Sequence, residues 1–145
     1  MAGTGVGKSL FMCHMACANM LEGKNVLYIT MEMAEERIAE RLDANLLDVT
    51  MEELGILPKS SYQKKMKRLM DTCTGKIVIK EYPTASANAN HFRHLLQELR
   101  TKKNFKPDVI YIDYLNICAS FRIRGGANAG SYAIVKAIAE ELRGL

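Results

Sequence analysis

Hydrophobic positions along the chain alternate between two spacings, one typical of helices and one typical of short buried strands. Residues 9–21 are apolar almost all round, which predicts a helix that is buried on every side. Residues 26–31 form a run of mainly β-branched and aromatic side chains, which predicts a strand covered on both faces. Apolar residues at helical spacing then predict a helix over 34–47.

The same alternation continues along the rest of the chain. Two short helices are predicted within residues 50–72, separated by a turn around Pro58. After them the sequence predicts a strand over 76–82, a helix over 90–103, a strand over 108–113, a glycine-rich loop from about 118 to 130, and a last helix from Ser131 that still runs at Leu145. No repeat or linker divides the sequence, so we expect one α/β unit with a mainly parallel sheet.

Composition narrows the class of protein. The chain has 145 residues, 48% hydrophobic and 25% charged, which fits one globular domain and excludes disordered and collagen-like chains. No apolar run approaches the roughly 18 residues of a membrane-spanning helix, and the start of the chain lacks a signal-peptide pattern. The four cysteines show no C-x-x-C spacing; they are Cys13, Cys17, Cys73 and Cys118. We expect reduced thiols and a cytoplasmic protein.

Charge is distributed unevenly along the chain. The formal net charge of +4 is by itself weak evidence for a polyanionic partner. Residues 32–54 hold eight acidic and two basic side chains, whereas residues 59–80 hold seven basic and one acidic. We expect the basic stretch to form a solvated helix face, with contact to DNA as the alternative.

A phosphate-binding motif stands directly before the first predicted helix. Gly3, Thr4, Gly5, Val6, Gly7, Lys8 and Ser9 carry the Gly-Lys-Ser end of a Walker A loop, with Ala2 where the common pattern has its first glycine. Glycines let successive backbone N–H groups point at phosphate oxygens, and the helix N-terminus adds further donors. Lys8 would neutralise phosphate charge, and the Ser9 hydroxyl could ligate Mg²⁺. The segment predicts binding of ATP or another nucleoside triphosphate.

Two acidic residues follow predicted strands. Asp113 closes an apolar strand in the form of a Walker B element, and we assign it to Mg²⁺, with a water molecule between the carboxylate and the metal. Glu32 follows the strand over 26–31 and is the candidate general base that polarises the attacking water. Glu35 and Glu36 are instead expected to be first-turn acids favoured by the helix dipole.

Other chemistry-bearing residues favour structural roles. Cys13 and Cys17 lie four positions apart on one helix without a second pair, so we expect core packing rather than a metal site. His91 and His94 are expected to be a helix surface pair. The nine methionines, including Met12, Met15 and Met20, are expected to fill the core.

Several short segments of the sequence indicate a family. These are Gly-Val-Gly-Lys-Ser at 5–9, Tyr-Ile-Thr-Met-Glu-Met-Ala-Glu-Glu at 28–36, Ile-Asp-Tyr-Leu at 112–115, and further stretches at 41–49, 102–105, 122–124 and 135–143. The chain resembles the DnaB-like replicative helicases of the RecA superfamily, and most of all their T-even phage branch. The resemblance covers nearly the whole chain.

The resemblance implies a RecA-like P-loop NTPase core and a motor function. Such a motor is a hexameric ring that hydrolyses ATP with Mg²⁺, translocates on single-stranded DNA and unwinds duplex at a replication fork, with primase and a helicase loader as partners. By position, Lys8 and Ser9 would bind phosphate and metal, Glu32 would activate water, and Asp113 would complete the metal site. The implied location is the cytoplasm of a phage-infected bacterium.

The loop after Asp113 would face the central channel of such a ring. No acidic residue occurs from Tyr114 to Ala139, whereas Arg122, Arg124 and Lys136 are present, so a phosphate backbone could approach unopposed. An ordinary solvated loop is the alternative to DNA contact.

We also expect this sheet to be incomplete at both ends. Residues 1–145 would form a partial ATPase domain that starts at the Walker A loop, without the strand that precedes such a loop and without an arginine finger. An isolated chain of this kind would be weakly stable and nearly inactive, since its loop lacks an anchor and its sheet edges are exposed.

Two other functions stay open on the sequence alone. One is a different RecA-like ATPase or a P-loop kinase, although no lid or acceptor pocket is evident. The other is a catalytically inactive fragment that keeps affinity for nucleotide or DNA.

Overall fold

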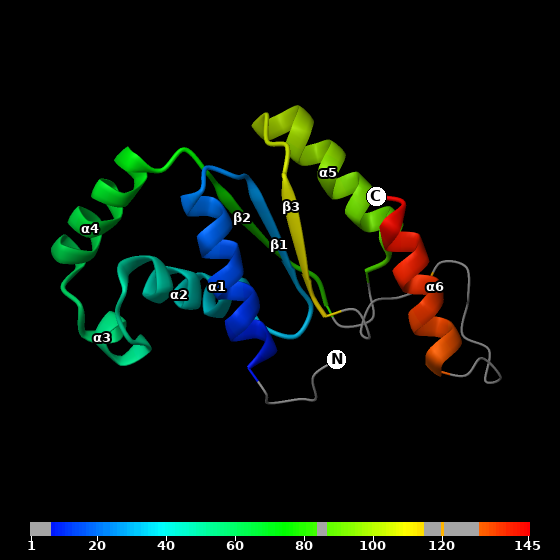
Figure 1. The fold of residues 1–145 in the computed structure, drawn as a ribbon, viewed down its shortest axis with the longest axis horizontal. Coiled ribbons are helices and arrows are strands. Elements are labelled where there is room, and N and C mark those ends of the chain that lie inside the picture. The colour runs from blue at the N-terminus through cyan, green and yellow to red at the C-terminus, as the bar shows by residue number, and fades with distance from the viewer. Residues whose placement is uncertain (1–6, 84–86, 115–119, 121–130) are drawn as a thin grey trace.

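The computed structural model describes residues 7–83, 87–114, 120 and 131–145, which form a three-stranded sheet with helices on both faces (Figure 1). The helices are α1 (Lys8–Leu21), α2 (Glu35–Leu47), α3 (Met51–Ile56), α4 (Lys59–Thr72), α5 (Ala89–Lys103) and α6 (Ser131–Arg143). The strands are β1 (Val26–Thr30), β2 (Ile77–Glu81) and β3 (Val109–Asp113). The predicted α/β class is confirmed.

All three strands run parallel, in the order β2-β1-β3. Val26 pairs with Ile77 on one side and with Val109 on the other, and Thr30 pairs with Glu81 and Asp113. The chain leaves β1 toward β2 through α2, α3 and α4, and it crosses back from β2 to β3 through α5 on the opposite face. The two crossovers run in opposite directions over opposite faces, so both have the same hand, and for parallel strands the usual hand is right-handed.

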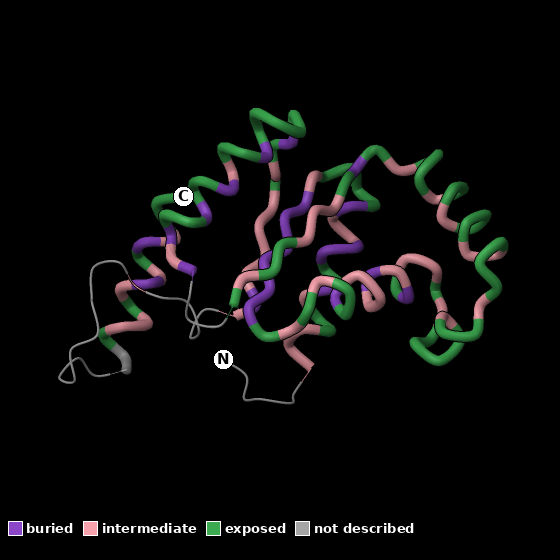
Figure 2. The backbone as a smooth tube through the Cα atoms, turned by 180° about the vertical axis from the view of Figure 1, so that it is seen from behind, coloured by how far each residue is buried: buried purple, intermediate pink, exposed green. Residues whose placement is uncertain are grey.

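Alternate residues of β1 face two separate hydrophobic clusters. Leu27 and Ile29 pack with residues of α5 and α6, whereas Val26 and Tyr28 pack with residues of α1 and α2. All five residues of β1 are buried, as expected for a central strand with helices on both faces (Figure 2). The prediction of a strand covered on both faces is confirmed.

Helix α1 differs from its prediction. The inward face, with Cys13, Cys17 and Met20, is buried, but Phe11 is 65% exposed and Met15 is 39% exposed. The prediction of a helix buried on every side was therefore wrong, and Met15 is not core filler. The described sheet and α2 contact only one side of α1, so its other apolar face has no covering layer among the described residues.

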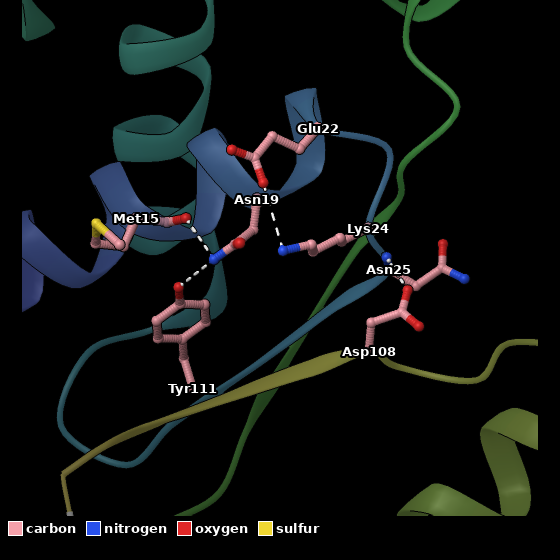
Figure 3. Close-up of polar contacts among 7 residues, drawn as sticks. All are labelled: Met15, Asn19, Glu22, Lys24, Asn25, Asp108 and Tyr111. Carbon is pink, nitrogen blue, oxygen red and sulfur yellow. Dashed lines mark hydrogen bonds and ion pairs between the residues drawn. The ribbon is translucent and has the colours of Figure 1, made fainter.

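The inward cysteines of α1 behave as core residues, as predicted. Burial raises the pKa of the Cys13 thiol and raises that of Cys17 to about 12, so both stay protonated at neutral pH. Asn19 fixes the same helix to the sheet, since its Nδ2 donates to Met15 O at 3.0 Å and to Tyr111 Oη of β3 at 2.7 Å (Figure 3).

The remaining boundaries agree with the predictions to within one or two residues. Helix α6 ends at Arg143 rather than running to Leu145, because Gly144 and Leu145 form turn hydrogen bonds to Glu141 and Leu142. His91 and His94 are both exposed on α5, as expected, and His91 Nδ1 accepts a hydrogen bond from Asn88 N at the N-terminus of the helix. Within the described ranges, no helix has both the length and the apolar character needed to cross a membrane.

Candidate nucleotide site

A crevice is expected between the carboxyl ends of β1 and β3. The helix that follows β1, α2, packs on one face of the sheet, whereas the helix that follows β3, α6, packs on the other. Chain segments that leave two neighbouring parallel strands toward opposite faces open a gap at that edge, and ligands of open α/β sheets bind there. Glu32 and Asp113 both lie at this edge.

The N-terminus of α1 carries the end of the phosphate loop. Gly7 is the N-cap residue and has φ 83°, a left-handed conformation that glycine adopts without steric cost. No side chain caps this helix end, and its first turn contains no acidic residue. Unsatisfied N–H groups and the positive end of the helix dipole are therefore available to an anion.

A turn directly after β1 positions Glu32. The Thr30 hydroxyl donates to Met33 O at 2.7 Å and accepts from Met33 N at 3.2 Å, which closes the turn around residues 31–33. Met31 N also donates to Asp113 O at 3.0 Å, so the parallel ladder extends one residue past the strand. Glu32 is exposed on this fixed turn, where its carboxylate can reach water.

A cavity of about 250 Å³ brings these elements together. Its lining comprises Gly7, Lys8, Ser9, Leu10, Glu32, Met33 and Arg41. The end of the phosphate loop and the candidate base thus share one cavity, as the sequence led us to expect. Its volume is below the roughly 300–1,000 Å³ of sites that enclose a whole small-molecule ligand, so it suits phosphate groups and a metal ion.

Arg41 is a member of this cavity that the sequence analysis missed. It lies on α2, three residues after the buried Ile38 and one before the buried Leu42, so helical geometry places it on the inward flank. That spacing was the available signal. A guanidinium beside Lys8 adds a second cation that could contact phosphate in two places at once.

Asp113 is held beneath the crevice at the end of β3. The side chain is buried, with 1% exposure, and its Oδ2 accepts a hydrogen bond from Tyr28 Oη at 3.1 Å. Its Oδ1 is buried without a hydrogen-bond partner among the described residues. An unpartnered buried carboxylate oxygen is costly, and a cation would remove that cost.

Lys8 approaches the same strand end. Its ammonium lies 4.6 Å from the centre of the Tyr114 ring, in a cation–π contact with the residue that directly follows Asp113. The predicted phosphate lysine and the predicted metal carboxylate are therefore at neighbouring positions in space. A triphosphate would offer Lys8 a stronger partner than an aromatic ring.

The residues present fit Mg²⁺ bound together with a nucleotide. Within the described part of the chain, no group of three or more His, Cys, Asp and Glu side chains could hold a metal by itself. Mg²⁺ commonly takes one or two protein oxygens and completes its shell with water and phosphate. Asp113 Oδ1 and the Ser9 hydroxyl are the oxygens that would hold it here.

Some predicted site residues cannot be placed. Gly3, Thr4, Gly5 and Val6 of the phosphate loop, and the predicted DNA-binding residues Arg122 and Arg124, lie outside the described residues. Lys136 is exposed on α6, on the face of the sheet opposite α1.

Burial also changes the pKa of Tyr28, which lies next to Asp113. It raises the pKa of Tyr28 far above its ordinary value, so the hydroxyl keeps its proton and donates to Asp113.

A larger cavity, of about 590 Å³, lies away from the strand ends, between α2, α3 and α4, and holds none of the predicted site residues.

Comparison with known proteins identifies the family. The DnaB-like helicase C-terminal domain family matches residues 1–145. A DnaB-like replicative helicase of Enterobacteria phage T4 is 51% identical over 148 residues, which cover 100% of this chain and 31% of that relative.

A solved structure, described as that of a DnaB-like replicative helicase and its interactions with primase, superposes with a TM-score of 0.68. The superposition covers 97% of this chain and 33% of that one at 17% sequence identity, so it confirms the RecA-like fold alone. The chain thus spans about a third of the length of each of these two proteins. With a family match along its whole length and a relative at 51% identity, this chain belongs to the DnaB-like helicase C-terminal domain family.

Proposed function

We propose that this chain is an ATP-hydrolysing motor segment of a phage-type replicative DNA helicase. The observation that carries the proposal is the meeting of three features at one strand edge: an uncapped helix N-terminus with Lys8, the cavity-lining Glu32, and the unpartnered oxygen of Asp113. Phosphoryl transfer needs these parts, because most of its catalysis is positioning and charge neutralisation.

In this proposal each residue has a separate task. Backbone N–H groups of the loop ending at Gly7 bind the β- and γ-phosphates, and Lys8 leaves the Tyr114 ring to neutralise their charge. Glu32 accepts a proton from the water that attacks the γ-phosphate in line with the departing diphosphate oxygen. Mg²⁺, held by Asp113 and Ser9, would supply further charge neutralisation at the phosphates.

The wider activity rests on the relatives. Because the T4 relative is named a replicative helicase, we propose that hydrolysis by this chain drives movement along single-stranded DNA in a ring of several copies. Primase is a proposed partner because it interacts with the structurally similar helicase. On the same family membership we propose a helicase loader as a further partner and the cytoplasm of an infected bacterium as the location.

The proposed DNA contacts are Arg122, Arg124 and Lys136. What supports them is the sequence around these residues, which contains three basic and no acidic side chains from Tyr114 to Ala139. Phosphate contacts of this kind supply affinity without reading bases.

The experiment uses a chimera in which this chain replaces the matched 31% of the T4 relative. We expect ATP hydrolysis that single-stranded DNA stimulates. Glu32→Gln should keep Mg²⁺·ATP affinity and lower kcat by about 10²–10⁴-fold, because the amide cannot accept the proton of the attacking water.

Glu36→Gln is the matched control, since Glu36 is an exposed acid four residues further on and lines no part of the cavity. Its kcat should equal that of the parent chimera. Normal hydrolysis by Glu32→Gln would overturn the assignment of the base, and phosphate transfer to an organic acceptor would favour a kinase.

A further inference from the structure

Tyr28 is fully buried directly beneath the candidate metal carboxylate. Its hydroxyl donates to Asp113 Oδ2 at 3.1 Å and lies 3.9 Å from Cys13 Sγ, which donates to it from α1. Both partners of the hydroxyl are themselves buried. The phenol therefore links the helix that begins at the phosphate loop to the end of β3.

The sheet register explains why a residue of β1 can reach Asp113. Tyr28 pairs with Tyr111, and Thr30 pairs with Asp113. Tyr28, Tyr111 and Asp113 thus share one face of the sheet, with Asp113 one step further toward the carboxyl edge. A side chain as long as tyrosine spans that diagonal step, whereas an aliphatic side chain at position 28 would stop short.

The hydrogen bond divides the two oxygens of Asp113 between different environments. Oδ2 is occupied by the phenol, and Oδ1 has no partner among the described residues. A carboxylate free to rotate could present either oxygen to a cation. One that is held through Oδ2 presents Oδ1 in a single orientation.

We propose that Tyr28 is a positioning residue that orients Asp113 for Mg²⁺·nucleotide binding. The proposal rests on the proposed function, because it assumes that Asp113 holds the metal. Hydrogen bonds that orient a metal ligand in this way commonly contribute about 10–100-fold to metal affinity. An ordinary buried tyrosine that merely satisfies its hydroxyl would contribute to stability alone.

Tyr111 provides a matched control for this distinction. Its ring stacks on that of Tyr28 with centroids 6.1 Å apart, and it lies on the same face of the sheet. Its hydroxyl, however, accepts a hydrogen bond from Asn19 Nδ2 at 2.7 Å (Figure 3). Among the described residues, the hydroxyl that bonds to Asp113 is that of Tyr28. Tyr111→Phe therefore removes a hydrogen-bonded phenol hydroxyl from the same layer without touching the carboxylate.

The test measures Mn²⁺ affinity by electron paramagnetic resonance in the chimera with the T4 relative, in the presence of a non-hydrolysable ATP analogue. We expect Tyr28→Phe to weaken Mn²⁺ binding about tenfold and to raise the Mg²⁺ concentration for half-maximal hydrolysis by a similar factor. Affinity for the analogue in EDTA should not change. Tyr111→Phe should leave all three quantities as in the parent chimera.

The outcomes separate the two proposals. A parent chimera that binds neither Mn²⁺ nor nucleotide would overturn the proposed function and this inference with it. If the parent binds both, equal Mn²⁺ affinities for Tyr28→Phe, Tyr111→Phe and the parent would overturn the positioning role alone. Urea unfolding of both variants checks that neither has lost its fold.

Discussion

At the residue scale, Gly75 lies in a tight junction just before β2. A Cβ atom at this position would collide with the carbonyl oxygen of Met20 and would lie 2.7 Å from that of Lys24. Both obstacles are backbone atoms, one in the last turn of α1 and one in the turn that follows it, and neither can rotate away as a side chain can. Glycine is therefore required here by the close approach of two chain segments.

Gly75→Ala should lower the free energy of unfolding by about 1–3 kcal/mol, because the added methyl group overpacks this junction. Gly55 is the control, since a Cβ there would meet nothing within 4 Å. Gly55→Ala lies in α3 and should raise stability by about 0.5–1 kcal/mol, because alanine loses less backbone entropy in a helix. Urea unfolding of both variants measures the difference, and equal losses would contradict the steric argument.

The candidate site was predictable where a residue's role follows from its place in a motif or at a strand end. That logic gave Lys8, Ser9, Glu32 and Asp113. It did not give Tyr28, because its reach to Asp113 depends on the register of β1 against β3, and a short apolar run carries no information about register.

At the scale of elements, α3 and α4 form an arm that is held to α2 by few contacts. Neither helix contains a buried residue. Helix α3 begins with a capping box, in which Glu53 N donates to Thr50 Oγ1 at 3.1 Å and Thr50 N donates to Glu53 Oε2 at 2.7 Å. Tyr62 of α4 donates to Asp43 Oδ2 of α2 at 2.8 Å, which fixes the arm's far helix.

The Asp43–Tyr62 contact makes part of the stability depend on pH. Partial burial raises the pKa of Asp43 above 3.8, although the bond from Tyr62 opposes the shift. The folded state then holds this proton more tightly than the unfolded state, so stability falls as pH rises from 3.8 through the raised pKa. The amide introduced by Asp43→Asn cannot ionise, but its oxygen can still accept the hydrogen bond from Tyr62.

We therefore expect the stability of Asp43→Asn, relative to the parent chain, to increase across that pH window and to level off above it. Urea unfolding at a series of pH values from about 3.5 to about 7 measures the difference. A difference that does not change with pH would show that Asp43 titrates alike in the folded and unfolded chain.

The type of each element was predictable, because the spacing of apolar residues differs between helices and strands. The burial of each helix face was not predictable. Helix α1 contains apolar residues all round, yet Leu10 is 58% exposed and Leu21 is 53% exposed. The composition of a helix gives its apolar content, but it does not show how many of its faces pack against other elements. The basic helix α4 was interpreted correctly as solvated, since Lys64, Lys65, Lys67 and Arg68 are all exposed.

At the scale of the whole molecule, helices α4 and α6 lie at opposite ends (Figure 1). The arm with α4 is on one side of the sheet and α6 is on the other, as both views show (Figures 1 and 2). Helix α4 carries five basic side chains and one acidic side chain, whereas α6 carries Lys136 and Arg143 together with two acidic side chains. The basic face of α4 and Lys136 of α6 are therefore two separate candidate contacts for a phosphate backbone.

The proposed DNA contacts at Arg122 and Arg124 are testable by salt dependence. In the chimera, Arg122→Ala combined with Arg124→Ala should flatten the slope of log affinity against log salt by roughly 1.4 units, at about 0.7 units per phosphate contact on a single strand. Lys64→Ala combined with Lys67→Ala on α4 should leave the slope unchanged. A flatter slope for the α4 variant, with an unchanged slope for the Arg122 and Arg124 variant, would place the DNA contacts on α4 instead.

The loosely held arm also bears on how such chains diverge. The turn between α3 and α4, with Ile56 82% exposed and Pro58 and Lys59 at the surface, lies far from the carboxyl edge of the sheet. Exposed turns of this kind are where proteins most readily accept inserted sequence and where proteases cut first. Related chains can therefore gain or lose residues at this tip, and a fluorescent tag could be attached there, without displacing the groups that surround Lys8 and Glu32.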